Sequence, residues 1–152
     1  MSKISPCLWF ARDAETAAAF YVSLLPDSRI DHVRRSPVDT PSGPAGDVLL
    51  VEFTLAGQPY LALNGGQPAE PSMSVSLLVR CDDQAEVDRL WAALVEGGRP
   101  LQCGWLVDRW GIHWQIVPRR MLELLADPVR APRAMAAMME MVKLDIATIE
   151  AA

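Results

Sequence analysis

Few side chains in this sequence have both the type and the spacing that chemistry requires. The three cysteines, Cys7, Cys81 and Cys103, lie far apart and form no Cys-x-x-Cys pair. An odd number of isolated cysteines argues against a disulfide framework and against a structural zinc. The chain contains two histidines, His32 and His113. The sequence therefore predicts neither a disulfide scaffold nor a zinc centre.

Tryptophan is the most suggestive residue type, with five copies in 152 residues. Trp91 falls on the apolar stripe of a predicted helix and Trp114 on a predicted strand, so we expect both in the core. Trp9 and Trp105 fit a core position and a place in a ligand cleft equally well. A cleft lined with indole rings suits a flat or apolar ligand.

The glycines do not form a nucleotide-binding loop. A methyl-transferring domain of the common kind needs a Gly-rich loop between a strand and a helix to hold its nucleotide-like cofactor. No Gly-x-Gly-x-Gly follows any predicted strand, and Asn64-Gly65-Gly66 is not followed by a helix start. We therefore interpret that segment as a hairpin exit and expect no cofactor.

Composition excludes several classes of protein. With 51% hydrophobic residues the chain can bury a real core, which excludes intrinsic disorder. Its 14 basic and 19 acidic residues give a net charge of -5, which does not suit a phosphate backbone. No apolar run approaches the about 18 residues of a membrane span, and no signal-peptide core follows Met1. We expect a small, soluble, cytoplasmic protein that contacts neither nucleic acid nor membrane.

The candidate residues are expected on the strands of an α+β fold. For the first half, the patterns predict a strand over 4–10, a helix capped by Asp13 and ended by Pro26, a strand over 29–35, a loop over 37–46, and a hairpin of strands 47–55 and 58–64.

A second cycle of elements begins near residue 73. The patterns predict a strand over 73–81, a helix opened by the capping box Asp83-x-x-Glu86 and ended by Gly97-Gly98, and strands over 101–107 and 112–117 with Asp108 capping their turn. A helix over 119–126 follows, then a break at Asp127-Pro128. A long tail to residue 152 keeps one face apolar through Met135, Met138, Met139, Val142, Ile146 and Ile149.

The two cycles are an internal repeat. A constant shift places Leu8 on Val79 and Phe10 on Cys81. A second correspondence matches the hairpins, so that Leu61 corresponds to Gln115. Each half is then a strand, a helix and three strands, and the two halves would form one curved mixed sheet around a shared cleft. This predicts a paired domain over 4–118, with modules 4–66 and 73–118, and a C-terminal helical extension over 119–152.

Particular segments make the repeat recognisable. They are Cys7-Leu-Trp-Phe, Phe20-Tyr21, Leu63-Asn-Gly-Gly66, Cys81-Asp82-Asp83, Glu86-Val-Asp88, Gly97-Gly98 and Cys103-Gly-Trp-Leu-x-Asp108-x-x-Gly111-x-x-Trp-Gln-Ile-Val-Pro118. With these segments the chain resembles the vicinal-oxygen-chelate superfamily of glyoxalases, extradiol dioxygenases and bleomycin-resistance proteins. Within it, the chain is similar to the PhnB-like family, also labelled the 3-demethylubiquinone-9 3-methyltransferase domain.

The resemblance also locates where a metal would bind. Many superfamily members hold a divalent metal with a histidine on the first strand of each half and a glutamate on its last strand. Here the histidine positions hold Ser5 and Ser76 (Pro6 and Ser74 if the register slips), and the glutamate positions hold Leu61 and Gln115. Hydroxyl, amide and alkyl groups are poor ligands for a divalent cation. We therefore expect no metal site.

Strand alternation selects the residues that would contact a ligand. If Phe10 and Cys81 face the helices, the residues one, three and five positions before each of them face the cleft. The candidate ligand-binding residues are Gln115, Trp9, Trp105, Ser76, Leu61, His113 and Arg80. Gln115 is the leading candidate because its amide both donates and accepts hydrogen bonds. Arg80 would attract an anionic ligand, although a surface arginine explains it equally well.

Two classes of function remain open at this point. The first is a protein that binds a small apolar or aromatic molecule in a cleft without the usual metal ligands. The second is a glyoxalase- or dioxygenase-type enzyme with an atypical metal or none, while a methyltransferase rests on the family label alone. No catalytic residue can be assigned. The predicted partners are a small-molecule ligand and a second copy of the chain, because an uncovered apolar tail and the resemblance both favour a homodimer with sheets or tails exchanged.

Overall fold

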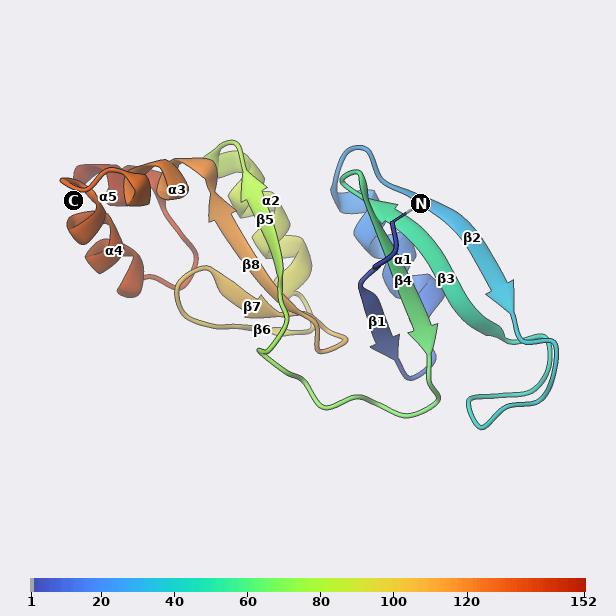
Figure 1. Cartoon of the computed structure of the whole chain (residues 1–152). Helices are drawn as coiled ribbons and strands as arrows, with labels where there is room; N and C mark the ends of the chain where they lie inside the picture. Colours follow the sequence, from blue (N-terminus) through green and yellow to red (C-terminus); the bar gives the residue numbers. More distant parts are fainter. Residues whose placement is uncertain (1) are drawn as a thin grey trace. The chain divides into compact units, whose positions relative to one another are not determined.

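The computed structural model describes residues 2–152 (Figure 1), which divide into a first compact unit ending at Glu70 and a second spanning Pro71–Ala152. Unit 1 contains β1 (Cys7–Phe10), α1 (Ala14–Leu24), β2 (Arg29–Arg35), β3 (Val48–Leu55) and β4 (Gln58–Asn64). Unit 2 contains β5 (Leu77–Cys81), α2 (Gln84–Val95), β6 (Arg99–Pro100), β7 (Trp105–Val107), β8 (His113–Pro118), α3 (Arg119–Ala126), α4 (Ala131–Met139) and α5 (Ile146–Ala151). The predicted α+β class is confirmed.

The two sheets have the same topology. Their strand orders are β1-β4-β3-β2 and β5-β8-β7-β6. In each sheet the first strand pairs in parallel with the last, and the other neighbours are antiparallel. The pairing of Cys7 with Leu61 recurs as the pairing of Leu78 with Gln115. Both correspondences of the sequence repeat, that of the first strands and that of the hairpins, are therefore confirmed. The joining of the two sheets around a shared cleft stays a prediction.

Each sheet packs its helix on one face (Figure 1). In unit 1, α1 buries one stripe of residues against alternate residues of the strands, as amphipathic elements do. The buried set is Leu8, Phe10, Ala14, Ala17, Ala18, Tyr21, Val51, Phe53 and Ala62. In unit 2 the corresponding set is Leu77, Cys81, Val87, Leu90, Trp91, Leu94, Trp114 and Ile116. Trp91 and Trp114 are core residues, as predicted.

The two helices begin with different caps. At α2 the Asp83 carboxylate accepts the Glu86 N–H at 2.8 Å, and Glu86 reaches back to the Asp82 N–H at 2.7 Å. This confirms the capping box. Asp13 occupies the N-cap of α1 but its side chain makes no capping bond. Instead Asn64, at the end of β4, accepts the Ala14 N–H at 2.9 Å.

Three of the predicted strands are wrong in part. Residues 4–6 lie outside β1, and residues 73–76 lie outside β5, where Met73 and Val75 are exposed. Of the predicted strand over 101–107, only 105–107 form a strand, β7, and residues 101–104 connect it to β6, with which it pairs antiparallel. Cys103 and Gly104 reverse the chain there with φ of 60° and 81°, and a Cβ on Gly104 would lie 3.0 Å from the Leu144 side chain.

The C-terminal extension is helical, as predicted, but its apolar face is not carried by one helix. After α3, the chain forms two short helices, α4 and α5, separated by residues 140–145. That connection is held by backbone bonds of 2.8 Å from the Cys103 N–H to the Met141 carbonyl and from the Gly104 N–H to the Val142 carbonyl. Gln84 of α2 adds two more bonds, to Leu144 and Ile146. These distant partners break a helix that local periodicity alone would continue.

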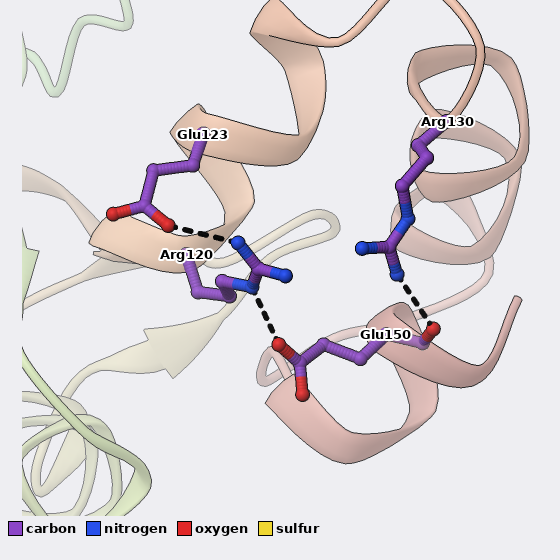
Figure 2. Close-up of polar contacts among 4 residues, drawn as sticks. All are labelled: Arg120, Glu123, Arg130 and Glu150. Carbon is purple, nitrogen blue, oxygen red and sulfur yellow. Dashed lines mark hydrogen bonds and ion pairs between the residues drawn. The ribbon is translucent and has the colours of Figure 1, made fainter.

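The tail is fastened by polar contacts as well. In Figure 2, the Arg120 guanidinium lies between the carboxylates of Glu123 and Glu150, and Arg130 donates to the main-chain oxygen of Glu150 at 3.0 Å. Beneath these contacts the tail buries an apolar cluster of Val117, Met121, Leu124, Ala134, Leu144 and Ile149. The tail thus covers its own unit, so an uncovered tail no longer argues for a dimer. Dimerisation stays a prediction from the resemblance.

Among residues 2–152, no helix is long and apolar enough to cross a membrane.

A buried carboxylate organises the turn between β7 and β8. Asp108 is 3% exposed, and its Oδ1 accepts the N–H groups of Trp110 and Ile112 at 2.9 and 3.0 Å. Its Oδ2 accepts the Trp114 indole N–H at 2.9 Å. The predicted cap is confirmed, and it additionally ties the turn to the core.

Replacing this carboxylate should therefore be costly. Asp108→Ala strands three buried or half-buried donors, so we expect a loss of about 2–4 kcal/mol in the free energy of unfolding. Urea denaturation followed by circular dichroism measures it. Asp82→Ala, which removes an exposed ion pair with Arg119, is the matched control and should cost less than about 1 kcal/mol. Equal losses in the two variants would contradict the role given to Asp108.

The attachment of the tail should weaken in acid. Hydrogen bonds from Lys143 and Gln84 lower the pKa of Asp88 below its usual 3.8, and bonds from Thr148 lower the pKa of Asp145. A folded-state pKa below the unfolded value stabilises the fold above pH 3.8, and the stabilisation disappears as pH falls through the folded pKa. Hydrogen-exchange protection factors of residues 143–151 should fall below about pH 4 more steeply than those of β8. The double variant Asp88→Asn, Asp145→Asn should show no such difference in steepness.

Candidate functional site

The face of the unit 2 sheet opposite α2, which we term the unit 2 open face, holds most of the predicted site residues. Along β8, Trp114 and Ile116 are buried on the α2 side, so alternation puts His113 and Gln115 on the open face. Ser76, Leu78, Arg80 and Trp105 join them, through β5 and β7.

Gln115 lies at the centre of this face. Its Nε2 donates to the Ser76 hydroxyl at 2.9 Å, and Leu78 and Trp105 are its neighbours on the two flanking strands. The amide is half-buried, and its Oε1 accepts no hydrogen bond within residues 2–152. Gln115 therefore has one half of its amide fixed and the other half available to a ligand.

His113 is the most unusual residue of the site. It is 3% exposed, and its Nδ1 is buried with no hydrogen-bond partner within residues 2–152. A buried polar atom without a partner costs about 1–3 kcal/mol, so such atoms are rare. Opposite it on β7 lies the apolar Val107. The structure thus places an unused hydrogen-bonding atom two residues from Gln115, on the same face.

Arg80 extends the face towards solvent. It pairs with Val117 and is exposed. It lies on the open face, so an anionic group there would meet its charge, but it is two residues beyond Leu78 along β5. The structure does not bring Arg80 next to Gln115.

Unit 1 has an open face of different character. Trp9 and Leu61 lie on the face opposite α1, together with Cys7, Leu50 and Leu63. Cys7 is exposed on this face, and partial desolvation raises the pKa of its thiol. On β3, Glu52 lies in register with Leu61 and accepts two bonds of 3.0 Å from Arg34, and His32 lies opposite it on β2. The open face of unit 1 is thus apolar along β1 and β4 and carries an ion pair and a histidine along β3 and β2.

The Trp9 ring has a fixed position. Its indole N–H donates to the Gln67 carbonyl at 2.7 Å, and the ring lies directly on the Cα of Gly65. A Cβ at Gly65 would be 1.9 Å from the ring atom Cζ2 of Trp9. With 43% of Trp9 exposed, the ring presents a rigid aromatic surface to solvent.

The donor set at the superfamily's metal positions does not fit a divalent cation. Ser76 and Gln115 bond to each other, Leu61 is an alkyl group, and Ser5 precedes β1. Within residues 2–152, no three His, Cys, Asp or Glu side chains are grouped so as to hold a metal. That the protein holds no metal remains a prediction, which metal analysis of the purified protein tests.

The candidate residues do not include every residue of the open faces. Alternation also puts Cys7 and Leu78 there, and Leu63, two residues after Leu61, is an addition that alternation alone could have made. Asn64 is a different case. The sequence predicts a hairpin exit at Asn64, but this residue is buried and bonds to both α1 and β3. The available signal was its position two residues after Ala62 on β4, which puts it on the α1 side.

Gly65→Ala tests the close approach of the Trp9 ring. The added methyl cannot coexist with the ring, so we expect the indole to swing away and its N–H bond to Gln67 to break. The Trp9 indole N–H resonance should move in a ¹⁵N spectrum, and stability should fall by about 1–3 kcal/mol. In the background Trp9→Ala the same substitution should cost little, since the clash is gone. Full additivity of the two changes would contradict the contact.

Comparison with known proteins agrees with this architecture. The profile of the 3-demethylubiquinone-9 3-methyltransferase family matches residues 2–117. Among solved structures, the chain is similar to the PhnB protein of Bacillus cereus, with 30% identity and a TM-score of 0.68 over 77% of this chain and 99% of that one. No curated protein matches the chain significantly.

More distant structures share the fold. Protein PA1353 from Pseudomonas aeruginosa matches with 21% identity and a TM-score of 0.63 over 78% of this chain and 98% of that one. A gene product of Arabidopsis thaliana matches with 18% identity and a TM-score of 0.51 over 77% and 98% of the two chains. The matches and the paired βαβββ topology lead to one conclusion: this chain belongs to the 3-demethylubiquinone-9 3-methyltransferase family, the PhnB-like branch of the vicinal-oxygen-chelate superfamily.

Proposed function

We propose that this protein binds a small molecule with a flat apolar body and one hydrogen-bonding group on the unit 2 open face. The observation that carries the proposal is the Nδ1 atom of His113, buried without a partner in the unit 2 open face. Because the atom is buried, the imidazole has to turn toward the ligand; a ligand hydroxyl or N–H that then bonded Nδ1 would remove the penalty of leaving it unpaired.

Gln115 supports the same assignment. Because Ser76 holds its Nε2, the orientation of the amide is fixed and Oε1 is the atom left for a ligand. Trp105 lies beside it on β7 and offers part of its indole surface. One polar group of a ligand would thus meet His113 and Gln115, two fixed groups on one strand, while an aromatic body would pack on the indole.

The open face of unit 1 offers a second surface on which an apolar molecule could pack. Trp9, Leu61 and Leu63 expose part of their surface there, and the Arg34–Glu52 pair carries no net charge. Arg80 adds a cation on the unit 2 open face, which would admit an acidic substituent. These groups can bind and orient a molecule; none of them is a nucleophile or a metal ligand set.

Paired aromatic probes test the hydrogen bond to His113. We expect the protein to bind 2-naphthol about tenfold more tightly than naphthalene, because the hydroxyl donates to Nδ1. In His113→Phe the preference should vanish. The control Glu96→Phe places the same aromatic ring at an exposed position after α2 and should keep it. Dissociation constants come from fluorescence titration of the probes.

Gln115→Leu provides a second readout. We expect weaker binding of 2-naphthol with a change in unfolding free energy below about 1.5 kcal/mol, since one half-buried hydrogen bond is lost. If the wild type binds both probes equally, or if neither variant changes affinity, the open face is not the ligand site.

A further inference from the structure

Unit 1 contains a separate pocket on the α1 side of its sheet. It has a volume of about 300 Å³, at the lower end of the range for small-molecule sites. Its walls are the start of α1, the loop between β2 and β3, and the first residues of β3. The lining residues are Arg12, Glu15, Thr16, Arg35, Ser42, Asp47, Val48 and Asn64.

The walls of the pocket are held in place by Asn64. This residue is 8% exposed; its Nδ2 donates to the Val48 carbonyl at 2.8 Å and its Oδ1 accepts the Ala14 N–H at 2.9 Å. It therefore links the first turn of α1 to the start of β3. Both its polar groups are used in this link, so Asn64 is a structural support of the pocket.

The loop wall is also fixed. Ser36 and Asp47 pair through a backbone bond of 2.9 Å, which closes the base of the loop. Arg35 donates from Nη1 to the Gly46 carbonyl at 3.0 Å. These bonds hold the arginine side chain over the loop and leave other guanidinium N–H groups for a ligand.

The charges around the pocket come in opposite pairs that do not neutralise each other. Two guanidinium groups, of Arg12 and Arg35, and two carboxylates, of Glu15 and Asp47, line one hollow. Among residues 2–152, no ion pair within 4 Å involves any of the four. A simple anion there would meet two carboxylates, and a simple cation would meet two guanidiniums. A molecule carrying both charges would satisfy both sets.

We propose that this pocket binds a small zwitterion, of which a free α-amino acid is the simplest. The ligand carboxylate lies toward Arg12 and Arg35, whose planar N–H groups match a carboxylate. The ligand ammonium lies toward Glu15 and Asp47, and the hydroxyls of Thr16 and Ser42 offer further hydrogen bonds. The pocket is polar and lies on the α1 side of the unit 1 sheet, whereas the residues proposed to bind the aromatic ligand belong to unit 2.

Nuclear magnetic resonance titration tests the site. Each of the twenty standard amino acids is added separately to the ¹⁵N-labelled full chain, up to about 10 mM. This concentration is high enough to detect a millimolar dissociation constant. We expect at least one amino acid to move the backbone amides of Glu15, Thr16, Ser42, Gly46 and Asp47. The N-acetyl derivative of that amino acid lacks the ammonium, and its carboxamide derivative lacks the carboxylate. Each derivative should therefore bind at least about tenfold more weakly than the free amino acid.

Variants of exposed residues locate the contacts. Arg35→Gln and Asp47→Asn should each weaken binding about tenfold, a change equal to losing one charge-assisted contact. Arg99→Gln, an exposed arginine of unit 2, is the matched control and should leave binding unchanged. His113→Phe should also leave it unchanged, which separates this pocket from the open-face site. Circular dichroism confirms that each variant is folded.

Other results would overturn the proposal. They are the absence of any shift in these amides, equal binding of the N-acetyl derivative, equal shifts on adding acetate or phosphate alone, and affinities that Arg35→Gln and Asp47→Asn do not change.

Discussion

The parallel pairing of the first strand with the last strand in each unit determines where every candidate side chain lies. Cys7 pairs with Leu61 and Leu78 with Gln115. Because side chains alternate along a strand, a slip of one residue would move Gln115 and His113 to the helix side and expose Trp114. The buried indole of Trp114, held by Asp108, therefore fixes the register in unit 2. The open face is a consequence of that register.

The sequence predicted most of the regular structure, and the reason is the repeat. The types of the elements, and the correspondence between the strands of the two halves, follow from patterns within each half. Alternation assigned Leu8 and Phe10 to the helix side. The errors at 101–104 and in the tail are at places where distant residues decide the conformation. Cys103 and Gly104 reverse the chain because they bond to Met141 and Val142, and no local pattern contains that information.

The candidate site divides in the same way. Alternation was enough to put Gln115, Ser76, Trp105 and His113 on one face, but the burial of His113 and its unpaired Nδ1 depend on packing. Asn64 shows the limit most clearly. A short polar residue before two glycines is typical of a turn, yet here it caps α1 where Asp13 does not. Only the fold brings Ala14 within its reach.

The two units have kept one register while their open faces have diverged in chemistry. Where unit 1 has Leu61, unit 2 has Gln115 with Ser76 bonded to it. Where β1 presents Trp9, β5 presents Arg80. An apolar surface binds a hydrocarbon without orienting it, because the hydrophobic effect has no direction, whereas hydrogen bonds do. The substitutions within the repeat therefore give the two open faces different chemistry: Gln115 and Ser76 of unit 2 provide directional hydrogen-bonding groups, whereas Leu61 of unit 1 provides only apolar surface.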